Sequence, residues 1–321
     1  MSEPACSPGR ACDRPAGVTG RAPDPAAGGL EGTVRWRELL AEGRRRLGGP
    51  ADARRIVEEA AGVPPAELLL VLDDPVTERG MARFDDMVAR REAGEPLQYV
   101  LGHWGFRSLD LMVDRRVLIP RPETEAVVEV ALAELDRLGG REVATTVVDL
   151  GTGSGAIALA VATERVRARV WAADLSEDAL AVARANLAGI GRAAARVTLA
   201  AGDWFDALPP ELRGTVQLVV ANPPYVATTA ELPAEVSAWE PTGALRAGED
   251  GLDAVRRLVA DAPGWLEPDG VLVCELSPEQ AGTATDLARA AFAEVRVEPD
   301  LTGRARALVA RRPRRAGGRG R

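Results

Sequence analysis

The chain has 321 residues, which is enough for one full domain and a smaller second one, and its hydrophobic content of 46% can supply a core. Its net charge of −8 argues against a surface that binds nucleic acid by bulk electrostatics. No apolar run approaches the roughly 18 residues of a membrane span and the N-terminus has no hydrophobic signal core, so we expect a cytoplasmic protein with no membrane partner.

Metal and disulfide chemistry are also disfavoured. The three cysteines, Cys6, Cys12 and Cys274, match neither a disulfide framework nor a metal-binding spacing. The single histidine, His103, cannot build a His-based metal site. We therefore predict no metal, and we expect Cys274, which lies in an apolar strand, to be inert core.

The first part of the chain divides into a tail, a bundle and a linker. Residues 1–32 are rich in Pro, Gly and Ala, which predicts a disordered tail. Residues 33–95 show helical spacing of apolar side chains, with prolines at helix starts, and predict a bundle of about four short helices. Residues 96–119 form the predicted linker, in which glycines and alternating apolar residues from Tyr99 to Val117 indicate a β-hairpin.

Strands and helices alternate over the predicted catalytic domain, residues 120–312, and an Arg-rich tail follows at 313–321. This alternation predicts an α/β fold with a Rossmann-like, mostly parallel sheet and helices on both faces. The predicted strands are 147–149, 170–173, 197–199, 216–221, 271–275, 295–297 and 307–310, and the predicted helices are 124–138, 156–163, 177–188, 252–262 and 279–292.

A glycine-rich loop follows the first of these strands. Gly151, Thr152, Gly153, Ser154 and Gly155 connect the strand to an Ala/Leu-rich helix. Glycines let the backbone approach a ligand closely, and the helix start supplies free N–H groups. The spacing is G-x-G-x-G rather than G-x-G-x-x-G, which disfavours a dinucleotide pyrophosphate.

An acidic residue ends the second strand of this domain. Asp174 follows the strand at 170–173, where acids in Rossmann-type sheets accept the two hydroxyls of a ribose. Alternatively, Asp174 only caps the next helix, although Ser176 could do that instead.

The tetrapeptide Asn222-Pro223-Pro224-Tyr225 follows the strand at 216–221. Its prolines have no N–H, so the loop offers acceptors: the Asn222 side-chain oxygen and the carbonyls around Pro223. Such acceptors suit both hydrogens of a planar –NH2 group, although prolines after a strand can also simply end it. With the glycine loop and the following acid, the tetrapeptide indicates S-adenosylmethionine and an amine or amide acceptor. Asp149, Asp174, Asp203 and Asn222 all fall at strand carboxyl ends, where ligands of such sheets bind.

These motifs resemble those of class I methyltransferases, and within them the N5-glutamine methyltransferases that act on peptide chain release factors. The resemblance covers about residues 33 to 312. It is strongest at 118–125, which is similar to the signature at the entry to the catalytic domain. Further similar stretches are 95–102, Asp203-Trp204-Phe205, Glu240-Pro241 and Ala244-Leu245.

The resemblance implies roles for individual residues. Asn222 and the Pro223 carbonyl would grip the acceptor amide, Pro224 would line its site, and Tyr225 would pack against it or serve only as core. Asp203 and Trp204 would lie beside the adenine, although Trp204 could instead fill the domain interface. Gly151, Gly153 and Gly155 would pass close to the methionine moiety, and Arg121 and Glu123 would lie near that end of the cofactor or form a structural ion pair.

The implied substrate is the glutamine of the Gly-Gly-Gln loop of release factors, recognised with the help of the helical bundle. The alternatives are a glutamine of a ribosomal protein, the N6 amine of adenine in nucleic acid, and a non-catalytic protein that binds S-adenosylmethionine as a sensor. Methylation of a base calls for a basic groove, and this chain is acidic, so we expect no direct nucleic-acid binding. The Arg-rich end could nevertheless contact RNA or an acidic partner.

Overall fold

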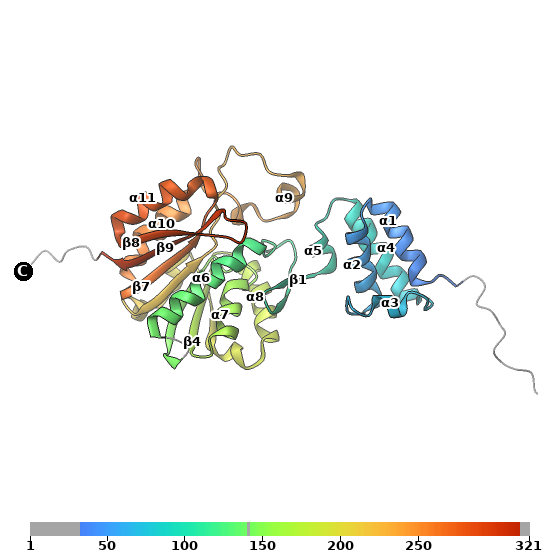
Figure 1. Cartoon of the computed structure of the whole chain (residues 1–321), viewed down its shortest axis with the longest axis horizontal. Helices are drawn as coiled ribbons and strands as arrows, with labels where there is room; N and C mark the ends of the chain where they lie inside the picture. The colour runs from blue at the N-terminus through green and yellow to red at the C-terminus, as the bar shows by residue number, and fades with distance from the viewer. Residues whose placement is uncertain (1–32, 140–141, 315–321) are drawn as a thin grey trace, which may run out of the picture.

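The computed structural model describes residues 33–139 and 142–314 (Figure 1). The tail expected at 1–32, with Cys6 and Cys12, lies outside the described residues, as does the Arg-rich end beyond residue 314. A helical bundle lies at one end of the molecule, and a larger domain built on a sheet lies at the other (Figure 1). No helix among the described residues is long and apolar enough to cross a membrane.

The N-terminal bundle consists of α1 (Trp36–Leu47), α2 (Pro50–Ala61), α3 (Leu68–Val71) and α4 (Glu78–Glu92). Proline begins α2 and the Thr77 side chain caps α4 by accepting from the Gly80 N–H at 3.0 Å, so both helix starts follow local sequence signals. Apolar side chains at helical spacing on α1, α2 and α4 make a core of their own, which includes Trp36, Ile56 and Phe84. The expected bundle of short helices is present.

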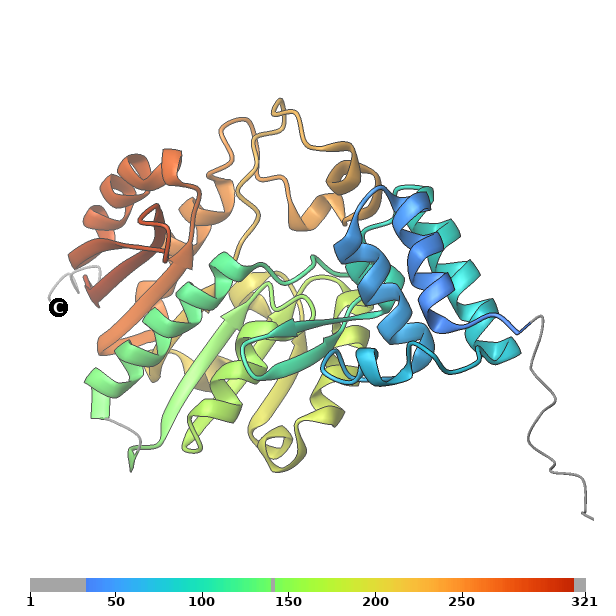
Figure 2. The same cartoon turned by 45° about the vertical axis from the view of Figure 1, so that its right-hand side comes forward.

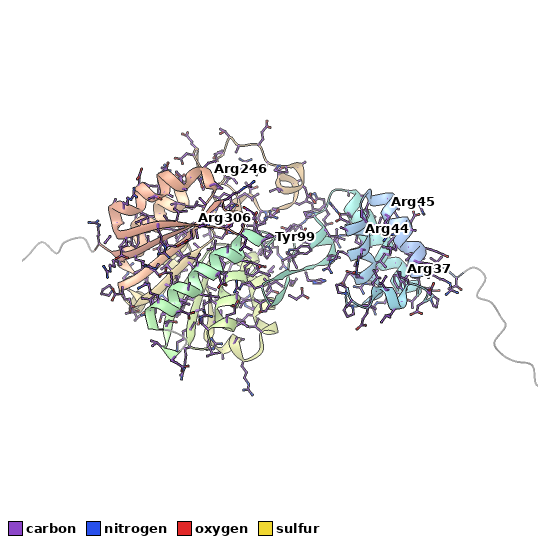
Figure 3. All side chains as sticks on the ribbon, in the orientation of Figure 1. Arg37, Arg44, Arg45, Tyr99, Arg246 and Arg306 are labelled. Carbon is purple, nitrogen blue, oxygen red and sulfur yellow. The ribbon has the colours of Figure 1, made fainter. Side chains whose placement is uncertain are left out.

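The linker hairpin is shorter than expected. It is present as β1 (His103–Phe106) and β2 (Leu109–Met112), but the prediction that it runs from Tyr99 to Val117 was wrong, because Tyr99 lies in the short helix α5 (Leu97–Leu101) and β2 ends at Met112. Pro96 precedes this helix, and Gly102 ends it with a φ of 82° that favours glycine. Tyr99 lies at the junction of the two domains (Figure 3), where its hydroxyl donates to the Val117 carbonyl at 2.5 Å.

The larger domain is built on a seven-stranded sheet with the order β5-β4-β3-β6-β7-β9-β8. Strands β3 to β7 are mutually parallel, and β9 runs antiparallel between β7 and β8. The bounds are β3 (Thr145–Leu150), β4 (Ala168–Asp174), β5 (Val197–Ala201), β6 (Val216–Ala221), β7 (Leu266–Glu275), β8 (Phe292–Pro299) and β9 (Ala305–Pro313).

Helices cover both faces of this sheet (Figure 2). On one face, Val147 and Val170 pack with α6 (Pro122–Gly139) and α7 (Ala156–Glu164), and α8 (Glu177–Gly189) continues this layer. On the other, Val148 and Cys274 pack with α10 (Asp253–Asp261) and α11 (Ala281–Ala291). Consecutive strand residues thus enter opposite cores, as expected for a sheet buried on both sides. The predicted α/β fold class is confirmed, and Cys274 is core.

Shorter elements occupy the connections. Helix α9 (Ala234–Trp239) lies in the long connection between β6 and α10, and helix α11 ends at Ala291 rather than at the expected residue 292, because Phe292 begins β8. The 3-10 helices are Gly191–Arg196, Trp204–Ala207, Pro210–Leu212, Thr242–Ala244, Ala262–Gly264 and Pro278–Gln280.

Candidate active site

A cavity of about 430 Å³ opens at the carboxyl ends of β3, β4 and β6. This is the size of a small-molecule site. Of the predicted site residues, it is lined by Arg121, Gly151, Thr152, Gly153, Ser154, Asp174, Asp203, Trp204, Asn222 and Pro224. Gly155, Pro223, Tyr225 and Glu123 do not line it. The parallel sheet therefore gathers most of the predicted residues, from segments far apart in sequence, around one space.

The glycine loop is held against the end of β4. The N–H groups of Gly151 and Thr152 both donate to the Ala173 carbonyl, at 2.9 and 3.0 Å. Gly151 and Gly153 have φ values of 72° and 57°, which residues other than glycine rarely adopt. A Cβ on Gly151 would point toward Trp204, 3.9 Å from its ring. The loop thus leaves open a space that any other residue at Gly151 would begin to fill.

The Asp174 carboxylate connects this loop to the next helix. Its Oδ2 accepts from the Gly153 N–H at 2.8 Å, and its Oδ1 accepts from the Ser176 N–H at 2.9 Å. The cap of α8 is the Ser176 hydroxyl, which accepts from the Ala179 N–H at 3.1 Å. A carboxylate has about four lone-pair directions, so Asp174 keeps two for a ligand. Two acceptors at this position suit the paired hydroxyls of a ribose.

Trp204 also lines the cavity and has an uncommon backbone conformation. Its φ of 48° is left-handed, which is rare for a large side chain and is found at functional sites. Gly202 permits the turn, because a Cβ there would lie 2.8 Å from the Ala207 Cα. The indole is half-buried and lines the cavity beside the exposed Asp203. A flat apolar face next to an acceptor suits a purine base.

The Asn222 side chain is held from outside its own loop. Its Nδ2 donates to the Thr124 hydroxyl at 3.0 Å, and this hydroxyl donates to Glu275 Oε2 at 2.7 Å. An ionised carboxylate only accepts, so the Thr124 proton points at Glu275 and its lone pair points at Asn222. No donor among the described residues contacts Asn222 Oδ1. The amide oxygen is therefore available as an acceptor.

The rest of the tetrapeptide is anchored by the backbone that follows it. Pro223 is buried, and the Tyr225 carbonyl accepts from the Gln280 side chain at 2.9 Å. The Val226 N–H donates to the Leu245 carbonyl at 2.8 Å. Burial raises the pKa of the Tyr225 phenol, with a further upward contribution from Glu275. The Tyr225 phenol therefore stays neutral.

Two buried acids underlie the site. Asp149 is fully buried, and its Oδ2 accepts from the Thr152 hydroxyl at 2.6 Å and from the Ala158 N–H at 3.0 Å. Burial raises the pKa of Asp149 to about 7. Burial likewise raises the pKa of Glu275 to about 7. One oxygen of each carboxyl, Oδ1 and Oε1, is buried without a hydrogen-bond partner among the described residues, which is costly and is typical of functional sites.

Arg121 pairs with a residue other than its sequence neighbour. Its guanidinium donates to Glu240, which is 6% exposed and also accepts from the Ile119 N–H at 3.2 Å. Glu123 is exposed and outside the cavity. The Arg121–Glu240 pair joins the stretch 118–125 to the segment 240–245, from which Pro241, Gly243 and Ala244 also line the cavity.

Sequence reasoning missed the roles of Thr124, Glu240 and Glu275. Thr124 and Glu240 lie within the similar stretches, but nothing there indicated which side chains meet. Glu275 carried a readable signal, because a charged residue that ends an otherwise apolar strand is expected to have a partner. Among the described residues, no group of three or more His, Cys, Asp or Glu side chains could hold a metal ion.

The residues around the cavity fit S-adenosylmethionine. The open glycine loop, the two remaining acceptor directions of Asp174 and the flat Trp204 face suit an amino acid moiety, a ribose and an adenine, respectively. The individual contacts remain predictions.

Family models match both domains. One described as the PrmC N-terminal domain covers residues 38–102, and one described as the methyltransferase small domain covers residues 130–237. Among solved structures, a methyltransferase from Pyrococcus furiosus aligns with a TM-score of 0.48 at 15% identity, over 74% of this chain and 98% of that one.

Curated relatives match at higher identity. A release factor glutamine methyltransferase of Moorella thermoacetica is 44% identical over 287 residues, which are 86% of this chain and 98% of the relative. One of Cereibacter sphaeroides is 43% identical over 265 residues, which are 82% of this chain and 91% of the relative. The similarity therefore spans nearly the whole length of both relatives.

Proposed function

Because the chain belongs to the release factor glutamine methyltransferase family, we propose that it transfers a methyl group from S-adenosylmethionine to the glutamine side-chain nitrogen in the Gly-Gly-Gln loop of release factors. The observation that carries this proposal is the Asn222 amide, which lies in the same cavity as the glycine loop and has its oxygen available to accept. Since such a substrate works with the ribosome, we also propose a cytoplasmic location.

The chain's contribution to the reaction is orientation. A carboxamide nitrogen is a poor nucleophile, because its lone pair is delocalised into the carbonyl. Asn222 Oδ1 would accept one N–H of the glutamine. The Pro223 carbonyl, which we propose accepts the other, belongs to a buried residue that does not itself line the cavity. The two contacts would hold the nitrogen in one plane and leave its lone pair free for the methyl group. Both contacts strengthen as positive charge grows on nitrogen, so they stabilise the transition state more than the ground state.

S-adenosylmethionine, when bound, supplies a methyl group already activated on a sulfonium. The chain therefore needs no acid to activate a leaving group. The methylated amide nitrogen would become acidic and would release one N–H proton, which balances the transfer. Gly151 and Gly153 would pass beside the amino acid moiety, Asp174 would hold the ribose, and Asp203 with Trp204 would hold the adenine. Ser154 and Thr152 complete the loop, and Arg121 and Pro224 line the remaining wall.

A protein substrate is favoured over a nucleic acid by charge and by architecture. The net charge of −8 offers no bulk attraction to phosphates. The additional domain is a helical bundle joined to the catalytic domain by a hairpin, rather than a basic groove for a duplex. We therefore propose that the bundle takes part in binding the release factor.

The test is methylation of defined acceptors. The full chain is incubated with methyl-labelled S-adenosylmethionine and a release factor, a ribosomal protein fraction or double-stranded DNA, and the label is mapped by mass spectrometry. We expect label on the Gly-Gly-Gln glutamine, and none when that glutamine is replaced by alanine. Label on a ribosomal protein or on adenine instead would overturn the proposed substrate while retaining the cofactor site.

A further inference from the structure

Three side chains from three separate elements form a buried hydrogen-bonded chain that ends on Asn222. Thr124 comes from the first turn of α6 and is 4% exposed, and Glu275 ends β7 and is fully buried. The distances are 3.0 Å from Asn222 Nδ2 to Thr124 Oγ1 and 2.7 Å from Thr124 Oγ1 to Glu275 Oε2. Thr124 lines the cavity and Glu275 does not. The proposed mechanism gives neither side chain a contact with the methyl acceptor, so the buried pair that they form needs a separate explanation.

The direction of these hydrogen bonds decides which end of the Asn222 amide faces the glutamine amide of the substrate. A hydroxyl that donates to a carboxylate has only lone pairs left for its other neighbour, so that neighbour must donate. The NH2 group of Asn222 is therefore held at Thr124, and Oδ1 is directed away from it. If these hydrogen bonds ran in the opposite direction, Thr124 would donate to Asn222 Oδ1. Asn222 would then present its N–H groups to the substrate NH2 group, which itself donates and needs hydrogen-bond acceptors.

We propose that Thr124 and Glu275 are positioning residues of the methyl transfer, and that the carboxylate of Glu275 sets the direction of the chain so that Asn222 presents its oxygen to the substrate amide. This inference rests on the proposed function, because it explains how Asn222 is kept in its productive orientation. It assigns a task to a carboxyl that is otherwise costly to bury.

The surroundings of Glu275 make this direction sensitive to protonation. Burial is the main cause that raises its pKa to about 7; the Thr124 hydrogen bond and the nearby Arg306 of β9 (Figure 3) lower it. The other charged groups that act on it are Glu123, which raises the pKa, and Arg121, which lowers it. The neutral Tyr225 also faces it from the loop after β6. A protonated Glu275 can donate to Thr124, so the direction of the chain is no longer imposed.

The first test removes or restores the hydroxyl. In Thr124→Val, which keeps the shape of the side chain, we expect kcat to fall about tenfold, the rate equivalent of one hydrogen bond, with little change in the KM for the release factor. Thr124→Ser should recover most of the loss. Thr145→Val is the matched control, because Thr145 is a buried threonine at the opposite, amino end of β3. Binding of S-adenosylmethionine, measured by calorimetry, should be unchanged in all three variants.

The second test follows pH. In the wild type, kcat should rise as pH rises through about 7 and then level off, because the carboxylate form imposes the productive direction. The glutamine in Glu275→Gln can donate or accept at any pH. Its kcat should therefore be lower than that of the wild type and should not fall further as pH drops below about 7, which is the decrease that we call the acid limb. Glu134→Gln is the control, because Glu134 is also buried but pairs with three arginines outside the cavity. It should keep the wild-type limb.

A third readout is independent of turnover. The carbon-NMR shift of the Glu275 carboxyl reports its titration in the protein without substrate. Loss of the Thr124 donor should raise the apparent pKa in Thr124→Val, and Thr124→Ser should bring it back. A Glu275 titration that is the same in the wild type and in Thr124→Val would show that the two groups are not coupled, and would overturn the inference.

Failure of the inference is distinguishable from failure of the proposed function. If Asn222→Ala turns over at the wild-type rate, the proposed grip on the acceptor is wrong. Two results would contradict the positioning role of Thr124 and Glu275 while retaining Asn222 as the hydrogen-bond acceptor of the substrate amide. One is an inactive Asn222→Ala beside a Thr124→Val that matches the wild type. The other is a Glu275→Gln variant that keeps the acid limb.

Discussion

Folding stability should depend on pH through Glu275 in a way that a single substitution reveals. The pKa of this buried carboxyl is raised from its ordinary value of 4.5 to about 7, mainly by burial. The folded protein therefore binds the proton more tightly than the unfolded chain does, and the stability that protonation contributes is fully present below about pH 4.5 and is lost as pH rises through about 7. The difference between the two pKa values corresponds to about 3 kcal/mol.

The assay is urea unfolding followed by tryptophan fluorescence at several pH values between about 5 and 8. The wild type should lose stability as pH rises through this range, and Glu275→Gln should lose about 2.5 kcal/mol less, because the glutamine stays neutral and most of the pKa difference lies within this range. Asp149 has a similarly raised pKa and makes the same contribution to the pH dependence of the unfolding free energy in both proteins. The effect of Glu275 is therefore the difference between the wild-type and Glu275→Gln curves of unfolding free energy against pH. Parallel curves for the wild type and Glu275→Gln would refute the reasoning.

Glu134 provides the control with the opposite sign. Burial raises its pKa, but hydrogen bonds from Arg311, Arg296 and Arg137 outweigh burial and lower the pKa to about 2. Its contribution is therefore present above about pH 4.5 and is lost only as pH falls toward 2. Because those arginines are partly exposed, Glu134→Gln should cost about 2 kcal/mol, equally at every pH between about 5 and 8.

Three further substitutions test the site. Asn222→Ala should lower kcat at least about 100-fold through loss of a transition-state acceptor, with S-adenosylmethionine affinity within about threefold by calorimetry; a rate close to the wild type would contradict its role. Asp174→Ala should weaken S-adenosylmethionine binding at least about tenfold, since it removes the ribose acceptors and releases the Gly153 N–H, and unchanged affinity would remove this assignment. Arg121→Gln should destabilise the fold by about 3 kcal/mol, because it leaves the buried Glu240 carboxylate without its cation, and an unchanged urea midpoint would show that the pair contributes nothing.

The parts of the site that sequence predicted are those whose residues are neighbours in the chain. The glycine loop and the tetrapeptide each follow a strand, and a parallel sheet brings the carboxyl ends of its strands to one edge. Knowing the strands was therefore enough to place Gly151, Asp174 and Asn222 together. The roles of these residues remain predictions, but the local sequence pattern and the topology of a parallel sheet were enough to predict that they lie around one cavity.

The parts that sequence did not predict depend on contacts across the fold. Arg121 meets Glu240 across 119 residues, and Asn222 meets Thr124 across 98. The family resemblance implied Glu123 at the site, and helix geometry explains why Thr124 is there instead: consecutive helix residues point about 100° apart, so only one of the two can face the sheet. Which of the two side chains faces the sheet depends on how α6 packs against it, and the sequence of residues 118–125 alone does not determine that packing.

Local signals also competed in the linker. Alternating apolar residues from Tyr99 onward fit a strand, but Pro96 and Gly102 fit the start and end of one helical turn, and these boundary residues prevailed. Val100 and Leu101 in this turn are buried in the core of the helical bundle, and Tyr99 is buried in a cluster with Val113 and Val117. A helical turn lets adjacent residues face different cores, which explains why tertiary packing favours it here.

Two of the buried glutamates, Glu134 and Glu275, show why one acid is structural and the other belongs to the site. Glu134 is surrounded by three guanidinium groups, so its charge is compensated and the fold gains stability from it. Glu275 has one hydroxyl as its direct partner and one oxygen without any among the described residues, so its charge weakens the fold at neutral pH. A carboxylate that costs stability is retained where its charge does something a neutral side chain cannot do. At Glu275 that task is to impose one direction on Thr124, and through it one orientation on Asn222.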